Sequence, residues 1–348
     1  MPARSSLAVA AAALLSACAA IPSAWADAGQ IHVYTWADYT SPELLAKFEK
    51  ETGIKTTVDT FDSNDTLLAK LQAGKSGYDI ILPSQNYVSI MIEQGLLEKV
   101  DVSSMPNYKN VDEKWRKPEW DPSQSYTVPW QWGTTSIVYM ADKFPQGFKS
   151  YKDLFEPADG IKGKIQLFRS QDGMLEIAEM YLDAPFCNED GATLKKIQKL
   201  YLDLKPHVKI FDDTGMGDHL GAGETTVALW YSGNAYQARV SNLPNMKYAF
   251  PKEGVMGWFD SVAIPKGAPN LENAKKFMNF VMDPENIAIE SNYAGDSNAY
   301  SASKPFLDPK VAAAEELKVP EGVPLKFARQ CPPKAAKLAS QVWTSVLK

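Results

Sequence analysis

The sequence has few of the residues and motifs that catalytic and metal sites use. It contains three histidines and three cysteines in 348 residues. His32, His207 and His219 are scattered, and none has a neighbour at the spacing of a metal ligand. The Gly-x-Ser-x-Gly and Walker motifs do not occur, and the glycine-rich stretch 215–223 lacks dinucleotide-binding spacing, so we expect it to enter a helix. The sequence therefore argues against a serine hydrolase, a metalloenzyme or a nucleotide-binding enzyme.

Neither basic charge nor apolar character is concentrated in the body of the chain. Lysine and arginine number 36 against 42 acidic residues, which gives a formal charge of −6. A nucleic-acid-binding surface needs a concentrated basic face, and no such cluster is present. No apolar run after the N-terminal segment is long enough to cross a bilayer. We expect no nucleic-acid partner and no membrane-spanning body.

The first 26 residues have the pattern of a secretory signal peptide. A basic residue precedes the apolar run Leu7–Leu15, and Ala24–Ala26 offers a small-x-small cleavage site. This pattern predicts export to the periplasm, with a mature chain that begins near Asp27. The alternative is that Leu15–Cys18 is a lipobox, in which case the cysteine would carry a lipid anchor.

Two cysteines, Cys187 and Cys331, remain in the mature chain. Cysteines in an oxidising compartment can pair. Because these two lie far apart in the sequence, spacing alone does not decide between a disulfide and two buried free thiols.

From Ile31 onward, predicted strands and helices alternate with short connections. Ile31–Trp36, Lys55–Phe61 and Tyr78–Pro83 have strand patterns. The helix after the first strand is capped by Thr40 or Ser41. A repeated strand–helix pattern predicts an α/β fold with a mostly parallel, doubly wound sheet.

The length of the chain exceeds what one hydrophobic core usually serves, so we expect two lobes. A similar strand–helix set follows the aromatic-rich extended segment Tyr126–Met140, which could cross from one lobe to the other. We assign residues 27–136 plus 261–303 to lobe 1 and residues 137–260 plus 304–348 to lobe 2. Crossing segments would then leave a ligand cleft between two doubly wound lobes.

Aromatic and acidic residues gather at the ends of predicted strands, most clearly in "TWADY" at 35–39 and "GWFD" at 257–260. An aromatic face attracts a cation by roughly 0.5–2 kcal/mol. A carboxylate adds a charge-assisted hydrogen bond to an ammonium group. Because ligands of open α/β sheets bind at strand ends, this pattern predicts a binding cleft for a cationic molecule. The alternative is that the aromatics pack and the acids are solvated.

The segments Tyr34–Ser84 and Phe250–Pro265 resemble the periplasmic polyamine-binding proteins of ABC transporters, the spermidine- and putrescine-binding type. The resemblance extends over essentially the whole mature chain. It implies a type II periplasmic-binding-protein fold without catalysis, metal or cofactor. It also implies a monomer that closes on a small amine ligand and delivers it to an inner-membrane ABC permease with its ATPase.

The resemblance assigns ligand-binding roles to individual residues. Asp260 corresponds to the family's aspartate that grips an amine, and Tyr231 stands where a tryptophan is common. The residues that match or replace family pocket positions with an aromatic, acidic or hydroxyl side chain are Trp36, Asp38, Tyr39, Ser84, Tyr231, Trp258 and Asp260.

Other positions depart from the family pattern in charge. Asn234 replaces an aspartate of putrescine binders, and Gly173 stands where a glutamate holds the distal amine. Arg169 lies in the same segment as Gly173, and Asp296 replaces a usual tyrosine. A buried ammonium without a partner is costly, so these losses weaken the case for a diamine unless Asp172 or Asp296 compensates.

Three functions follow from these observations. The first is capture of a polyamine such as putrescine or spermidine. If Arg169 points into the cleft, the pocket is dipolar and suits a zwitterion such as 4-aminobutyrate, with the amine on Asp260. An ordinary surface salt bridge is the alternative for Arg169. A secreted α/β hydrolase is the remote third function, for which the sequence lacks a reactive constellation.

Overall fold

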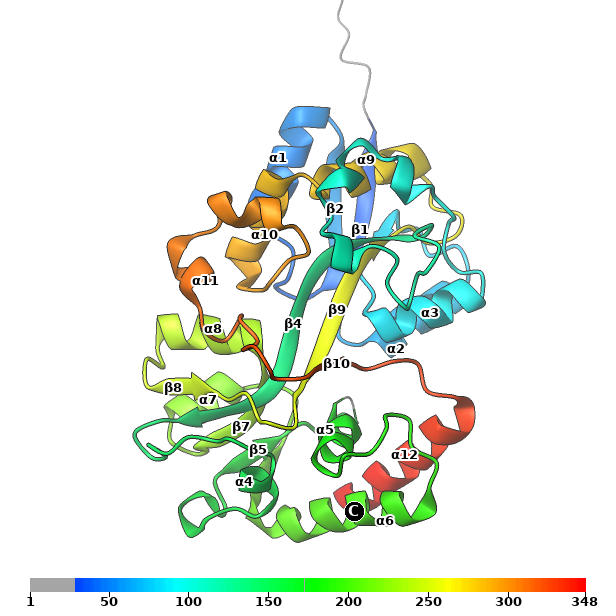
Figure 1. Cartoon of the computed structure of the whole chain (residues 1–348). Coiled ribbons are helices and arrows are strands. Elements are labelled where there is room, and N and C mark those ends of the chain that lie inside the picture. The colour runs from blue at the N-terminus through cyan, green and yellow to red at the C-terminus, as the bar shows by residue number, and fades with distance from the viewer. Residues whose placement is uncertain (1–28, 172) are drawn as a thin grey trace, which may run out of the picture.

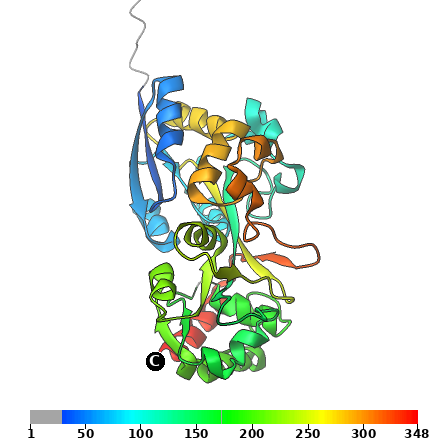
Figure 2. The ribbon, with the colours of Figure 1, turned by 90° about the vertical axis from the view of Figure 1, so that its left-hand side faces the viewer.

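The computed structural model describes residues 29–171 and 173–348. The predicted signal peptide, Cys18 and Asp172 lie outside the described residues. The described chain forms two α/β lobes that lie one above the other and share one continuous sheet (Figures 1 and 2). The strand order is β2-β1-β3-β9-β4-β7-β5-β6, with β10 beside β9 and β8 beside β4. None of the helices described here is long and apolar enough to span a bilayer.

Lobe 1 contains the first strand–helix units. Ser41 caps its first helix as predicted, because its side chain accepts a hydrogen bond from the Leu44 amide. Strand β1 pairs in parallel with β2 and β3. The elements of this lobe are β1 (Gln30–Trp36), α1 (Pro42–Thr52), β2 (Lys55–Phe61), α2 (Asn64–Gln72), β3 (Ile80–Ile81), α3 (Gln85–Glu93), α9 (Leu271–Val281) and α10 (Pro284–Ala294).

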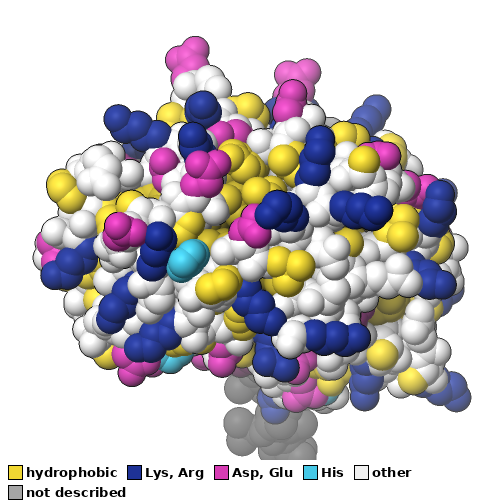
Figure 3. Space-filling model, turned by 90° about the horizontal axis from the view of Figure 1, so that it is seen from below, with side chains coloured by type: hydrophobic (Ala, Val, Ile, Leu, Met, Phe, Trp, Pro, Cys, Tyr) yellow, Lys and Arg dark blue, Asp and Glu magenta, His cyan; other side chains and the backbone are white. Residues whose placement is uncertain are grey.

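Lobe 2 repeats this arrangement around the parallel strands β5, β6 and β7. Its glycine-rich stretch enters helix α7, as expected. Seen from below, the protein carries intermixed basic and acidic side chains (Figure 3). The elements are α4 (Lys152–Phe155), β5 (Ile165–Leu167), α5 (Met174–Tyr181), α6 (Gly191–Leu204), β6 (Val208–Phe211), α7 (Met216–Gly221), β7 (Val227–Tyr231), α8 (Ser232–Ser241), β8 (Met246–Tyr248) and α12 (Pro333–Leu347).

Two long antiparallel strands, β4 (Thr127–Met140) and β9 (Val255–Ala263), run from one lobe into the other (Figure 1). Their side chains contribute to both cores: Trp130 and Phe259 pack in lobe 1, and Ile137 and Met256 pack in lobe 2. The predicted crossing by residues 126–140 is therefore confirmed. The predicted parallel pairing holds among β1, β2 and β3 and among β5, β6 and β7. The crossing strands β4 and β9 pair antiparallel with each other, and they also pair antiparallel with β7 and β3, respectively.

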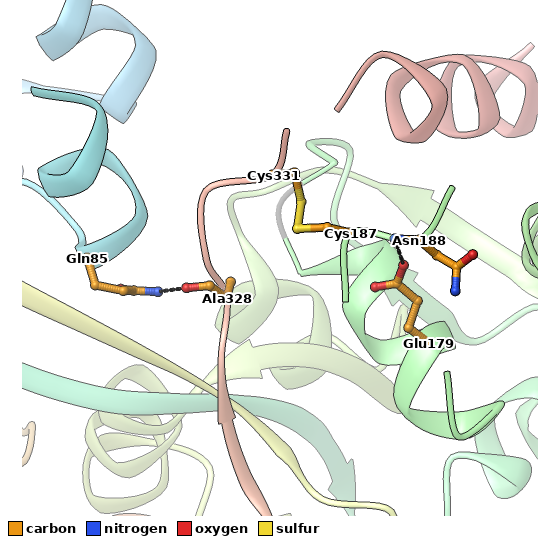
Figure 4. The surroundings of a disulfide bond; sticks show 6 residues. All are labelled: Gln85, Glu179, Cys187, Asn188, Ala328 and Cys331. Carbon is orange, nitrogen blue, oxygen red and sulfur yellow. Dashed lines mark hydrogen bonds between the residues drawn. A yellow bond between two sulfur atoms is a disulfide. The ribbon is translucent and has the colours of Figure 1, made fainter. Parts of the chain in front are cut away.

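A third segment returns the chain to lobe 2 through α11 (Pro309–Ala313) and β10 (Leu325–Phe327), which pairs with β9. The buried side chain of Gln85 fastens this segment to lobe 1, because its amide donates to the Ala328 carbonyl at 3.0 Å. Cys187 and Cys331 fasten it to lobe 2 through a disulfide (Figure 4). The structure thus shows the disulfide and not two buried free thiols, the two alternatives that the sequence left open.

Replacing both cysteines by serine should lower the free energy of unfolding by about 2–4 kcal/mol, because the disulfide restricts a long loop of the unfolded chain. Urea denaturation, followed by fluorescence, measures this change. Reductant should produce a similar loss in the wild type and none in the double variant. Equal stability of the oxidised wild type and the double variant would contradict the prediction.

Candidate ligand-binding site

The loop between β1 and α1 carries the "TWADY" motif. Its first aromatic, Trp36, packs against Phe61 with ring centroids 4.5 Å apart, and its indole nitrogen donates to the Leu82 carbonyl at 3.0 Å. Asp38 has a positive φ of 53° and an exposed side chain, whereas the hydroxyl of Tyr39 is buried. The loop therefore turns its acid outward and its tyrosine hydroxyl inward.

Asp260 lies beneath this loop and is 5% exposed. The Ser84 hydroxyl donates to its Oδ1 at 2.7 Å, and the Asn64 side chain in turn exchanges two hydrogen bonds of 3.1 Å with Ser84. This chain of contacts fixes the carboxyl group. Burial raises the pKa of Asp260 to about 6, although the Ser84 and Tyr39 hydroxyls oppose that rise by favouring the carboxylate.

Two further carboxyl groups, Asp296 and Glu290, are buried in the same lobe. One oxygen of Glu290 accepts the Ser41 amide at 2.9 Å, while its Oε1 has no hydrogen-bond partner among the described residues. The Oδ1 of Asp296 likewise has no such partner. This oxygen lies so close to Gly233 that a Cβ at that position would come within 2.0 Å of it, so only glycine permits the approach.

The charges of these three acids all act on the hydroxyl of Tyr39. Burial, followed by the charges of Asp260, Asp296 and Glu290, raises the pKa of Tyr39 well above its usual value. Burial also raises the pKa of both Asp296 and Glu290 well above the usual range. Among the described residues, no lysine, arginine or histidine forms an ion pair with any of the three acids. We call Asp260, Glu290 and Asp296 the acid cluster.

The acid cluster does not have the geometry of a metal site. In the part of the chain that the structure describes, no group of three or more histidine, cysteine, aspartate or glutamate side chains could hold a metal ion. The cluster thus offers carboxyl oxygens to a cation that brings its own hydrogen atoms, such as an ammonium group.

Two aromatic side chains flank the site at the junction of the lobes. Trp258 and Tyr231 meet edge to face with centroids 6.4 Å apart, and Tyr231 stacks on Phe168 at 5.3 Å. Trp258 and Asp260 were predicted at a strand end, but they lie inside β9, because that strand continues from one lobe into the other. Tyr231 does end its strand, as predicted.

The remaining predicted positions are on or near the surface of lobe 2. Asn234, in α8, and Arg169, after β5, are exposed. The carbonyl of Arg169 accepts the Trp343 indole N–H at 2.8 Å, and its guanidinium forms no ion pair with a described residue. Gly173 begins α5 with φ of 80°, a conformation that strains any other residue, so this backbone could not carry the family's glutamate without strain.

The structure thus brings Tyr39, Ser84, Asp260 and Asp296 together and leaves Asp38, Asn234 and Arg169 exposed. Sequence reasoning missed Glu290. The signal was present, because Glu290 lies three residues after Ile287 on the buried face of a helix, where an acid is unusual.

The chain is similar to known proteins over most of its length. The sequence profile of the family described as "Bacterial extracellular solute-binding protein" matches residues 43–319. The putrescine-binding periplasmic protein SpuD of Pseudomonas aeruginosa is 35% identical over 92% of each chain. The putrescine-binding periplasmic protein PotF of Escherichia coli is 30% identical, also over 92% of each chain.

Solved structures show the same fold. A spermidine/putrescine ABC transporter substrate-binding protein, PotD of Streptococcus pneumoniae, superimposes with a TM-score of 0.83 at 26% identity, over 92% of this chain and 98% of that chain. A putative spermidine/putrescine ABC transporter protein of Listeria monocytogenes gives 0.82 at 29% identity, over 91% and 98%. Together these findings support the predicted periplasmic-binding-protein fold.

Replacing Ser84 by alanine should raise the pKa of Asp260 above its value of about 6, because the lost hydrogen bond stabilises the ionised carboxylate. Carboxyl carbon NMR of the ligand-free protein across a pH titration measures the shift. Ser103→Ala is the matched control, because Ser103 makes the same kind of bond to a surface aspartate, Asp101. An unchanged or lower pKa of Asp260 in Ser84→Ala would contradict this assignment.

Proposed function

Because this chain belongs to the bacterial extracellular solute-binding protein family, we propose that its solute is a polyamine of the putrescine and spermidine class. Members of this family are binding components of transporters, so the protein is not an enzyme, and the secreted hydrolase is set aside. The observation that carries the proposal is the acid cluster, which is buried and has no ion-pair partner among the described residues.

Removing the carboxylates of the acid cluster from water carries a desolvation cost. Burying an ionised carboxylate is expensive unless it is paired and hydrogen-bonded, yet three acids are buried within one lobe. An ammonium group supplies the missing positive charge and up to three N–H donors. Its donors suit the Oδ1 of Asp296 and the Oε1 of Glu290, which lack partners among the described residues. One cationic end of the ligand therefore belongs in lobe 1, against Asp260.

The aromatic residues would hold the rest of the ligand. A polyamine combines an apolar methylene chain with charged ends, and an aromatic face favours both. Trp258 and Tyr231 provide such faces at the junction of the lobes. Asp296 supplies an acid where the family has a tyrosine, which supports a polyamine despite the neutral residues Asn234 and Gly173.

Transport requires that the protein captures and later releases its solute. The strands that cross between the lobes could act as hinges for both steps. We propose that the lobes close about β4, β9 and β10, so that the closed form is presented to an inner-membrane ABC permease with its ATPase. The signal-peptide pattern and the periplasmic relatives support export to the periplasm. We further propose that the protein acts as a monomer, with lobe boundaries near residues 136, 260 and 303.

A calorimetric panel of putrescine, spermidine and 4-aminobutyrate at neutral pH tests the choice of ligand. We expect putrescine or spermidine to bind more tightly than 4-aminobutyrate, because the carboxylate of the zwitterion would be repelled by the acid cluster. A preference for 4-aminobutyrate would instead support the dipolar pocket with Arg169. Absence of binding by all three would contradict the proposed function.

The role of Asp260 has a separate test. Asp260→Asn should weaken polyamine binding by roughly 30-fold or more, the loss expected when one member of a buried charge pair is removed. Asp203→Asn is the control, because Asp203 is an exposed acid on α6 that pairs with Lys199. Near-wild-type affinity of Asp260→Asn in calorimetry would remove Asp260 from the binding site.

A further inference from the structure

If all three carboxyl groups were ionised, the acid cluster would carry more negative charge than one ammonium group can neutralise. Its three members come from different segments: Asp260 from β9, Glu290 from α10, and Asp296 from the loop after α10. Each is at least 94% buried, and each carboxyl influences the same tyrosine, Tyr39. Three buried acids that interact in this way titrate as a group.

No described cation neutralises the cluster from the elements packed around it. On α1, Lys47 contacts Asn286 and Glu285, one turn away from Glu290 on α10. Three tyrosine hydroxyls also lie in these surroundings: Tyr39, Tyr248, whose pKa is raised by burial and by charges that include Asp296, and Tyr300, which donates to the Pro129 carbonyl. The Arg239 guanidinium of α8 is paired with Glu316.

Because no described lysine, arginine or histidine forms an ion pair with these acids, ionising all three at once is costly. Burial and mutual repulsion both favour the neutral, protonated form of a carboxyl group. The directions agree, since burial raises the pKa of Asp260 to about 6 and raises the pKa of both Glu290 and Asp296 well above the usual range. Burial and the carboxyl oxygens without hydrogen-bond partners among the described residues therefore favour protons on members of the acid cluster in the ligand-free site.

We propose that a cationic amine enters this site in exchange for protons from the acid cluster. The inference rests on the proposed function and goes beyond it. The ligand is already protonated, because aliphatic ammonium groups have pKa values near 10. Its positive charge favours the carboxylates, so the O–H bond of a neutral carboxyl group breaks and the proton passes to solvent or buffer. No other bond changes.

Exchange makes affinity depend on pH in a defined direction. Protons and the amine compete for the same oxygens, so the association constant should rise with pH while the cluster titrates. The slope of its logarithm against pH equals the number of protons released per ligand bound. A site of permanently ionised carboxylates would show no such slope near neutral pH.

Glu290 is the member best suited to isolate this effect. Its Oε2 accepts the Ser41 amide and thereby helps to position the loop that carries Tyr39. Glutamine keeps an oxygen that accepts this hydrogen bond but cannot ionise. Glu290→Gln thus removes the proton while preserving the position of the loop, which makes Glu290 a positioning residue with a separable electrostatic role.

The experiment is calorimetry of putrescine binding at pH 7 in three buffers of different ionisation enthalpy. The dependence of the observed heat on buffer enthalpy gives the protons released. We expect the wild type to release a measurable number of protons per putrescine bound, on the order of one. Glu290→Gln should release fewer, and the exposed-acid control Glu51→Gln should match the wild type.

The outcomes separate this inference from the proposed function. Binding of putrescine by the wild type with no proton release would overturn the exchange while leaving the function intact. If Glu290→Gln and Asp296→Asn both release as many protons as the wild type, the released protons do not come from the acid cluster, and this assignment is overturned. Failure of the wild type to bind putrescine, spermidine and 4-aminobutyrate would overturn function and exchange together. The wild-type count decides the exchange even if a variant does not fold.

Discussion

Three carboxyl groups are buried in lobe 1 without an ion pair to any described lysine, arginine or histidine, and the site depends on this constraint. Tyr39, Ser84 and the Ser41 amide surround Asp260 and Glu290 with polar groups but supply no positive charge. A structural ion pair would have brought its own lysine or arginine. The missing charge therefore has to come from protons or from a ligand, and this requirement links the fold to solute capture.

The crossing strands make that chemistry useful for transport. Asp260 and Trp258 lie on β9, whose two ends pack in different cores, so the acid and the aromatic face are built into the connection between lobes. Beside β9, the returning segment is held by Gln85 and by the disulfide of Cys187 and Cys331. Under the proposed closure, a ligand held by Asp260 would therefore contact one of the segments about which the lobes bend.

Much of the fold could be predicted from the sequence, because helix caps and strand-forming segments mark the same elements that the structure contains. Ser41 specifies the first cap, the strand-forming residues of Ile31–Trp36 specify the first strand, and the "TWADY" motif located Tyr39. The antiparallel crossing, the disulfide pairing and Glu290 could not be predicted in this way. Each depends on residues far apart in sequence, whose proximity only tertiary packing establishes, as in the hydrogen bond from Ser41 to Glu290.

We propose that the positive charge of the ligand completes the acid cluster. Calorimetry that compares putrescine with 1,4-butanediol, its uncharged counterpart of the same chain length, tests this proposal. Putrescine should bind, and the diol should give no detectable heat of binding at the same concentrations. Comparable affinity for the two molecules would show that shape and apolar contact, and not the buried carboxyl groups, select the ligand.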